Sequence, residues 1–214
     1  MKLAIYGSGG LGRETLELAN TIGKHSEIIF IDDTKDNNTI INGHKTLTYE
    51  YFKLYEDKNL FECIIAIGEP YDRKCLFEKL EKDGYKFANL IHPSVQISNT
   101  TTIGKGCIIQ TFAIISCNTT IGNNVVIADK VTLSHDSIVG DNTIVSSGVL
   151  LAGHVSVGKN TFIAMSVLII QEIKIGDSCI IGAMSMVNKD IVENSIAYGI
   201  PAKVVKKNIK KKVF

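Results

Sequence analysis

The sequence lacks three features that would assign a chain to a class at once: net charge, paired cysteines and a long apolar run. Its formal net charge is +1 over 214 residues, so no overall field favours nucleic acid or an anionic membrane. The five cysteines are odd in number and contain no CxxC pair, which argues against a disulfide framework and a metal site. The first apolar run is short and meets glycines, so it is neither a signal peptide nor a membrane span. We therefore expect a cytoplasmic protein that has no metal, nucleic-acid partner or membrane insertion.

Strand and helix signals alternate over the first ~90 residues. A hydrophobic content of 45% is enough to bury a real core. The order of the signals predicts a small parallel sheet with helices on its faces, a Rossmann-like βαβ domain over residues 1–90. The predicted strands are Leu3–Tyr6, Glu27–Ile31 and Cys63–Ile67, and the predicted helices are Arg13–Ile22 and Tyr71–Lys82.

From Ile97 to Val187 an aliphatic residue stands at every sixth position without a gap. A second period lies over the first, because an aliphatic-Gly pair recurs every 18 residues, at Gly104, Gly122, Gly140, Gly158 and Gly176. Three hexads thus form one unit, which predicts a three-sided coil over residues 91–200. Small or β-branched residues, from Val125 to Ser185, stand two places before the aliphatic positions, point to the same side of a strand and fill the core. We expect glycine to ease the turns at the corners.

Residues 201–214 carry five lysines in a short stretch, Lys206, Lys207, Lys210, Lys211 and Lys212. A phosphate site is one interpretation of this cluster. A frayed, solvated C-terminal tail is the interpretation that the position favours.

A glycine-rich motif follows the first predicted strand. Gly7, Gly9 and Gly12 fit G-x-G-x-x-G, and Asp32 lies twenty residues beyond Gly12. Such glycines let the backbone approach phosphate at a helix N-terminus. An NAD-dependent enzyme is therefore one hypothesis, but residues 1–90 are too few for two mononucleotide halves and a substrate site.

Taken together, these pieces resemble the PglD/NeuD-like family of sugar O- and N-acetyltransferases, within the hexapeptide-repeat acyltransferase superfamily. The matching segments are Tyr6–Glu14, Phe30–Asp33, Ile65–Gly68, Leu90–Ser94, Ser134–Asp141 and Tyr198–Lys203. The resemblance implies a left-handed parallel β-helix after the Rossmann-like domain, acetyl-CoA as co-substrate and a homotrimer. It also implies acetyl transfer to the amino group of a nucleotide-linked sugar, a UDP- or dTDP-4-amino-4,6-dideoxy sugar, in bacterial surface-glycan precursor synthesis.

The resemblance places the catalytic residues at Ser134-His135-Asp136. His135 suits a general base because the ordinary pKa of histidine lies near neutrality, and it stands off the two core-facing positions of its hexad. Asp136 is expected to favour the imidazolium that forms during transfer. The backbone N–H of Gly153 is implied as the donor that stabilises the thioester oxygen.

The remaining site residues also come from the resemblance. The acetyl-CoA positions are Ile144, Met165, Ala183, Gly199, Pro201 and Lys203. The positions that hold the nucleotide sugar are Ser8, Gly9, Gly10, Leu11, Gly12, Asp32, Asp33 and Gly68, with Arg73 as a candidate phosphate partner. Relatives often have histidine where this chain has Leu11 and Ile144, and glycine where it has Ala183.

Other hypotheses remain open. A hydroxyl acceptor, as in sialic-acid O-acetylation, needs the same base and oxyanion donor. A non-catalytic β-helix scaffold would need neither. His135 and His154 could also share a metal as in hexapeptide-repeat carbonic anhydrases, but no matching third histidine stands in the repeats.

Overall fold

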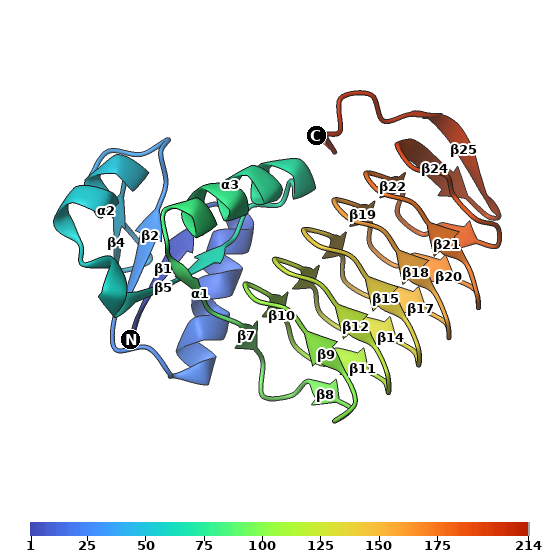
Figure 1. Cartoon of the computed structure of the whole chain (residues 1–214), viewed down its shortest axis with the longest axis horizontal. Coiled ribbons are helices and arrows are strands. Elements are labelled where there is room, and N and C mark those ends of the chain that lie inside the picture. Colours follow the sequence, from blue (N-terminus) through green and yellow to red (C-terminus); the bar gives the residue numbers. More distant parts are fainter. Residues whose placement is uncertain (214) are drawn as a thin grey trace.

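The computed structural model describes residues 1–213 apart from the side chain of Tyr55. The N-terminal part of the chain contains a six-stranded sheet (Figure 1). The strand order is β3-β4-β2-β1-β5-β6, with β3 antiparallel and the others parallel. The strands are β1 (Lys2–Tyr6), β2 (Ile28–Ile31), β3 (Thr39–Ile41), β4 (His44–Leu47), β5 (Phe61–Ile65) and β6 (Lys86–Phe87). The helices are α1 (Gly10–Ile22), α2 (Tyr49–Tyr55), the 3₁₀ turn η1 (Lys58–Leu60) and α3 (Pro70–Lys82).

Side chains of β1 alternate between two cores, as the strand period requires. Leu3 and Ile5 pack with α1 and with strands of the C-terminal half, whereas Ala4 and Tyr6 pack with α2 and α3. One face of the sheet is thus docked, through α1, on the second half of the chain (Figure 1).

The β3–β4 hairpin was not predicted from the sequence. Its turn is Asn42-Gly43, and both residues have positive φ, 48° and 81°. Asn-Gly between short apolar runs is a strong hairpin signal, so the motif could have been found. Helix α2 was also missed, although the Thr48 side chain caps its start by accepting from the Tyr51 N–H.

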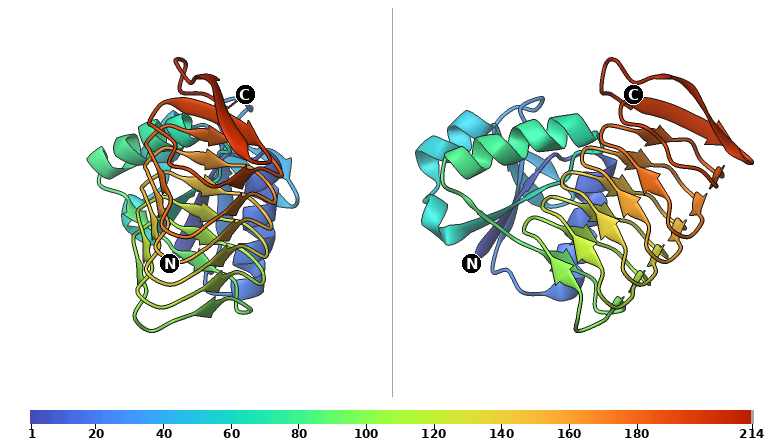
Figure 2. Two further views of the ribbon diagram at one scale, coloured as in Figure 1. Left: turned by 90° about the vertical axis from the view of Figure 1, so that its right-hand side faces the viewer. Right: turned by 45° about the vertical axis from the view of Figure 1, so that its right-hand side comes forward.

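The hexads form a stack of coils with three flat faces, as predicted (Figure 2). Each predicted aliphatic position is the second residue of a two-residue strand. Strands β7 to β20 each pair in parallel with the strand 18 residues on, as Ile108–Ile109 does with Val126–Ile127. The strands are β7 (Leu90–Ile91), β8 (Gln96–Ile97), β9 (Thr102–Ile103), β10 (Ile108–Ile109), β11 (Ile114–Ile115), β12 (Thr120–Ile121), β13 (Val126–Ile127), β14 (Thr132–Leu133), β15 (Ile138–Val139), β16 (Ile144–Val145), β17 (Leu150–Leu151), β18 (Ser156–Val157), β19 (Phe162–Ile163), β20 (Leu168–Ile169), β21 (Lys174–Ile175), β22 (Ile180–Ile181) and β23 (Met186–Val187).

We call the three sheets the first, second and third face. Each face takes every third strand. The first face begins at β7 and lies against α1, the second face begins at β8 and ends at β23, and the third face begins at β9 and ends at β21. Val145, Leu151 and Val157, one from each face, point into a common core and are buried. The apolar column therefore runs continuously from coil to coil.

The expected role of the 18-residue glycines is wrong in its mechanism. Gly104, Gly122, Gly140, Gly158 and Gly176 do not have positive φ. A Cβ on any of them would lie within 2.8 Å of atoms in the next coil, so the close approach of neighbouring coils demands glycine there. The left-handed corner position lies elsewhere, and polar residues fill most of it: Asn118, Asn124, Lys130, Asp136, Asn142, Gly148, His154, Asn160, Ser166, Glu172, Ser178 and Met184. Asn and Asp tolerate this conformation better than most residues.

The expectation of a frayed tail from residue 201 is also wrong over most of its length. Strands β24 (Ser195–Gly199) and β25 (Ala202–Lys207) form an antiparallel hairpin that extends the first face. Asn208 is buried and its side chain donates to the Ser178 carbonyl at 3.0 Å. The Val213 N–H donates to the Glu69 carboxylate at 2.9 Å, which ties the end of the chain to the start of α3. Among the described residues, no helix combines the length and apolarity needed to cross a membrane.

Candidate functional site

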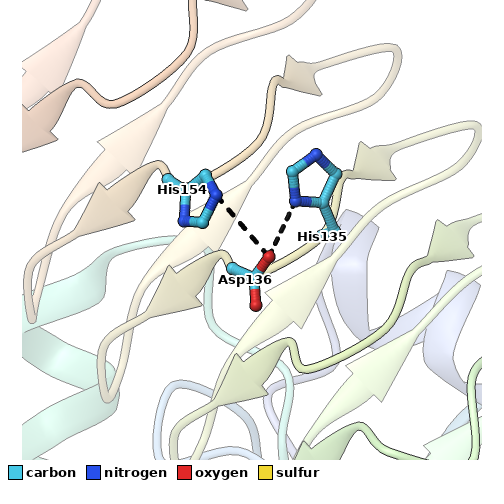
Figure 3. A group of neighbouring side chains, drawn as sticks. All are labelled: His135, Asp136 and His154. Atoms are coloured by element: carbon cyan, nitrogen blue, oxygen red, sulfur yellow. Dashed lines mark hydrogen bonds and ion pairs between the residues drawn. The ribbon is translucent and has the colours of Figure 1, made fainter.

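The corner between the second and third faces carries His135 and Asp136 on an exposed turn (Figure 3). Asp136 and His154 occupy the same left-handed corner position one coil apart, with φ of 58° and 59°. Equivalent corners stack along the coil, so side chains 18 residues apart emerge side by side. The two imidazole rings are 5.1 Å apart at an interplanar angle of 87°.

A carboxylate orients the imidazole of His135. The Nδ1–H of His135 donates to Asp136 Oδ2 at 2.8 Å, and Asn118 Nδ2 donates to Oδ1 at 3.0 Å. The hydrogen bond from His135, followed by that from Asn118, lowers the pKa of Asp136 below its ordinary value. Donation from Nδ1 leaves the lone pair on Nε2, the nitrogen that a general base needs.

Gly153 lies one coil beyond His135 in the same register. A Cβ there would stand 2.5 Å from His135 Cε1 and 2.6 Å from Nε2, so only glycine leaves room for the ring. The Gly153 carbonyl accepts from the Glu172 N–H at 3.0 Å. Gly153 is buried, and its own N–H has no hydrogen-bond partner within residues 1–213.

The predicted sugar loop and part of the predicted CoA groove meet in one hollow of about 460 Å³ between the two halves of the chain. Leu11 and Gly68 line it from the Rossmann-like side, and Ile144 and Met165 from the coil. Met165 and Ala183 are exposed and one coil apart on the corner between the first and second faces. The same edge leads to the hairpin that carries the other predicted CoA residues, where the Gly199 N–H donates to Ser185 Oγ at 3.0 Å.

Pro201 and Lys203 are exposed on that hairpin. The predicted acetyl-CoA residues other than Gly153 therefore follow one edge of the coil. Within one chain the structure does not bring this edge to His135, because the second face separates the two corners.

The glycine loop exposes the start of α1. No side chain caps this helix, which begins at Gly10 after Gly9, and both glycines are exposed. An added Cβ on Gly12 would collide with the Gly7 carbonyl, so the loop requires that glycine for close packing. A helix start with free N–H groups and the positive end of its dipole is suited to a phosphate.

Beside this loop lies a second hollow of about 610 Å³, lined by Ser8, Gly9, Asp32 and two cations that sequence reasoning missed, Arg13 and Lys35. Arg13 Nη1 donates to the Ser8 carbonyl at 3.2 Å. Arg13 follows Gly12 directly in the motif, so its position in the first turn of α1 was a usable signal.

The two aspartates after β2 hold the loop. Asp32 accepts from the N–H and hydroxyl of Ser8 and from the N–H and hydroxyl of Thr34. Burial alone raises the pKa of Asp32, but these hydrogen bonds outweigh it and the pKa lies below its ordinary value. Asp33 accepts from the Tyr6 hydroxyl at 2.5 Å and the Tyr49 N–H at 2.7 Å. Both carboxylates are thus already engaged within the protein.

Arg73 is a correction to the expected site. It is fully buried, and its guanidinium donates to the Ile65, Ile67 and Asn124 carbonyls and to Asn124 Oδ1. Asn124 in turn donates to Asn142 at 2.9 Å. Arg73 therefore joins α3 to the coil and cannot reach a phosphate in solvent.

Both halves of the chain match known protein families. Residues 2–80 match the PglD N-terminal domain, and residues 118–153 match the bacterial transferase hexapeptide repeats. A GDP-perosamine N-acetyltransferase of Escherichia coli O157:H7 is 30% identical over 118 residues, about half of the length of each chain (52% of both).

Solved structures extend the match over nearly the whole chain. The acetyltransferase domain of PglB from Neisseria gonorrhoeae FA1090, also solved with acetyl coenzyme A, shares 26% identity with a TM-score of 0.90 over 95% of this chain. The match covers 99% of the domain solved alone and 98% of the complex. PerB from Caulobacter crescentus, solved with CoA and GDP-perosamine, has the same fold, with 24% identity and a TM-score of 0.89 over 96% of this chain and 98% of its own. The expected Rossmann-like domain and left-handed β-helix are confirmed: the chain contains a PglD-type N-terminal domain followed by hexapeptide repeats, with the fold of the PglB acetyltransferase domain.

Proposed function

We propose that the chain transfers acetyl from acetyl-CoA to the amino group of a nucleotide-linked amino sugar. One observation carries the proposal: an Asp136-oriented His135 lies against Gly153, whose N–H has no hydrogen-bond partner among the described residues. A base and an oxyanion donor on neighbouring coils are the two groups that acyl transfer needs.

In the proposed reaction, Nε2 of His135 removes a proton as the amine attacks the thioester carbonyl. The Gly153 N–H donates to the carbonyl oxygen as it becomes negative. Asp136 stabilises the imidazolium, which returns its proton as CoA thiol leaves. The chain's own groups thus account for each proton.

The N-terminal domain supports a nucleotide-linked acceptor. The open start of α1 and the cations Arg13 and Lys35 surround a hollow large enough for part of a nucleotide. In this proposal Asp32 and Asp33 position the loop, and Ser8 to Gly12 contact the phosphates and sugar. The names of the PerB complex and of the Escherichia coli relative, both concerning GDP-perosamine, support an amino sugar. Both co-substrates of such a reaction would be met in the cytoplasm, where we place the protein.

We also propose a homotrimer in which each neighbour completes the site. His135 stands at one edge of the second face and the hollow with Ile144 and Met165 stands at the other. Between them the second face exposes Ile114, Leu150 and Leu168. Burying this apolar strip against another copy would bring one chain's His135 toward the next chain's hollow. Sedimentation under assay conditions tests this, and a stable, active monomer would contradict it.

The experiment is release of CoA from acetyl-CoA in the presence of GDP-, UDP- and dTDP-linked amino sugars, with an unmodified sialic acid as the hydroxyl acceptor. Removal of the base in His135→Ala should lower the rate by about 10²- to 10⁴-fold. Acetyl-CoA binding by calorimetry and the melting temperature should remain as in the native chain. A rate change below about tenfold would refute the role of His135, and acetylation of the sialic acid alone would replace the amino acceptor with a hydroxyl.

A further inference from the structure

His154 has no part in the proposed reaction, yet it completes a group of three metal-ligating side chains. We propose that His135, Asp136 and His154 form an inhibitory Zn²⁺ site that switches off the base. A third histidine is not needed, because Asp136 supplies the oxygen ligand between the two rings.

The spacing of the ligand atoms fits a small tetrahedral ion. His135 Nδ1 lies 2.8 Å and His154 Nε2 lies 3.7 Å from Asp136 Oδ2, and one ligand atom from each residue lies within 4.8 Å of the others. Ligands at 2.0–2.1 Å from a tetrahedral Zn²⁺ stand about 3.3 Å apart. The two observed distances bracket that value, and ligand atoms up to 4.8 Å apart must be drawn together by side-chain rotation.

The surrounding contacts favour a metal at this point. Asn118 occupies Oδ1 of Asp136, which leaves Oδ2 facing both imidazoles (Figure 3). A ligating carboxylate held by such an outer hydrogen bond is typical of metal sites. The side chains of His135, Asp136 and His154 are 49%, 36% and 50% exposed, so an ion can enter and keep a water. Two imidazoles with one carboxylate select Zn²⁺ and its neighbours over Mg²⁺ or Ca²⁺.

Metal binding would change the tautomer of the base. In the working state Nδ1 of His135 carries the proton and Nε2 carries the lone pair. A metal on Nδ1 moves the ring proton to Nε2, so that this nitrogen donates and can no longer accept. This step rests on the proposed function. It predicts loss of kcat with an unchanged KM for acetyl-CoA, because the ion lies at the Nδ1 edge of the ring, which is turned toward Asp136.

The test begins with binding, which needs no activity. Chelator-treated protein is titrated with Zn²⁺ by calorimetry and with Co²⁺ by visible absorption, since Co²⁺ bound in a tetrahedral site absorbs strongly. The test variant is His154→Asn, because asparagine accepts the left-handed corner and already occupies it at residue 118. The control is Cys117→Ser, which removes an exposed thiol one coil before His135. We expect one Zn²⁺ per chain, and His154→Asn should weaken binding by at least about tenfold while the control leaves it unchanged.

Kinetics then separate the two proposals. Zn²⁺ should reduce kcat of the native chain, and His154→Asn should need at least about tenfold more Zn²⁺ for the same reduction. Equal Zn²⁺ binding by the native chain and His154→Asn, or no binding by either, overturns the metal site. Zn²⁺ binding that depends on His154 in a chain without acetyl transfer overturns the proposed function and leaves the metal site standing.

Discussion

The substitution Gly153→Ala tests whether the position of the His135 imidazole is critical for the proposed reaction. The φ of Gly153 is not positive, so alanine fits the backbone of this turn without strain. The added methyl would lie 2.5 Å from Cε1, 2.6 Å from Nε2 and 3.2 Å from Nδ1 of His135. Normal carbon contacts are about 3.5–4.0 Å. The ring must therefore retreat by about 1 Å, because the backbone of the coil is fixed by its neighbours on both sides.

A displacement of that size should be costly for catalysis and cheap for folding. Misplacing a reacting group by about 1 Å can reduce the rate by about 10²-fold. His135 is half exposed, so its retreat into solvent leaves no cavity and the melting temperature should stay within a few degrees of native. The assay is kcat for CoA release, with the melting temperature measured in parallel.

The control is Gln171→Ala, an exposed position in the same register one coil beyond Gly153, which should leave kcat unchanged. A Gly153→Ala variant with native kcat would show that the imidazole position is not critical, and the assignment of His135 and the Gly153 N–H as partners would fail.

Three further predictions concern the N-terminal domain. Arg13→Ala should raise KM for the nucleotide sugar by about tenfold or more, because hydrogen bonds to charged groups contribute about 1.5–3 kcal/mol. The control is Lys24→Ala, just beyond the other end of α1. Equal effects of the two variants on KM would refute a contact between Arg13 and the nucleotide sugar. Arg73→Leu leaves the Ile65, Ile67 and Asn124 acceptors unpaired, so the free energy of unfolding should fall by roughly 3–5 kcal/mol in denaturant titrations. The exposed Lys82→Ala should change it little, and a similar small loss in Arg73→Leu would contradict the structural role. Asp32 has a lowered pKa in the folded state, so its stabilising effect is present above the ordinary carboxyl pKa and is lost as pH falls toward the lower folded value. The difference in melting temperature between the native chain and Asp32→Asn should therefore shrink on acidification. A difference that does not change with pH would refute the stabilising role of the ionised Asp32.

Periodicity carried most of what the sequence could predict. Side chains such as Leu133 and Leu151 occupy equivalent positions one coil apart. One correctly placed hexad therefore fixes the positions of all the strands in the stack, and the strands lie where they were predicted. The same translation relates Asn118, Asp136 and His154, so their column was available from spacing once the corner position was known. Glycine spacing alone pointed to the wrong corner residue, since close approach and positive φ both select glycine.

Other parts depended on contacts distant in the sequence. An arginine at the fourth position of a helix is expected to be a surface cation. Arg73 is instead buried and joins α3 to the coil, because it packs against Asn124, 51 positions away in the sequence. The lysine-rich end was predicted to be solvated because its charges favour exposure, but the side chain of Asn208 and the N–H of Val213 anchor the segment to distant residues. Neither environment leaves a local pattern in the chain.

The stacking of coils also measures length. Met165 and the β24–β25 hairpin are separated by a whole number of coils along one edge, and each coil adds about 4.8 Å. A relative with one more 18-residue unit between them would place the hairpin one step farther from the thioester end, with the His135–Gly153 pair untouched. In the proposed complex with acetyl-CoA, the number of coils beyond the His135 turn therefore sets the distance between the reacting thioester and the hairpin.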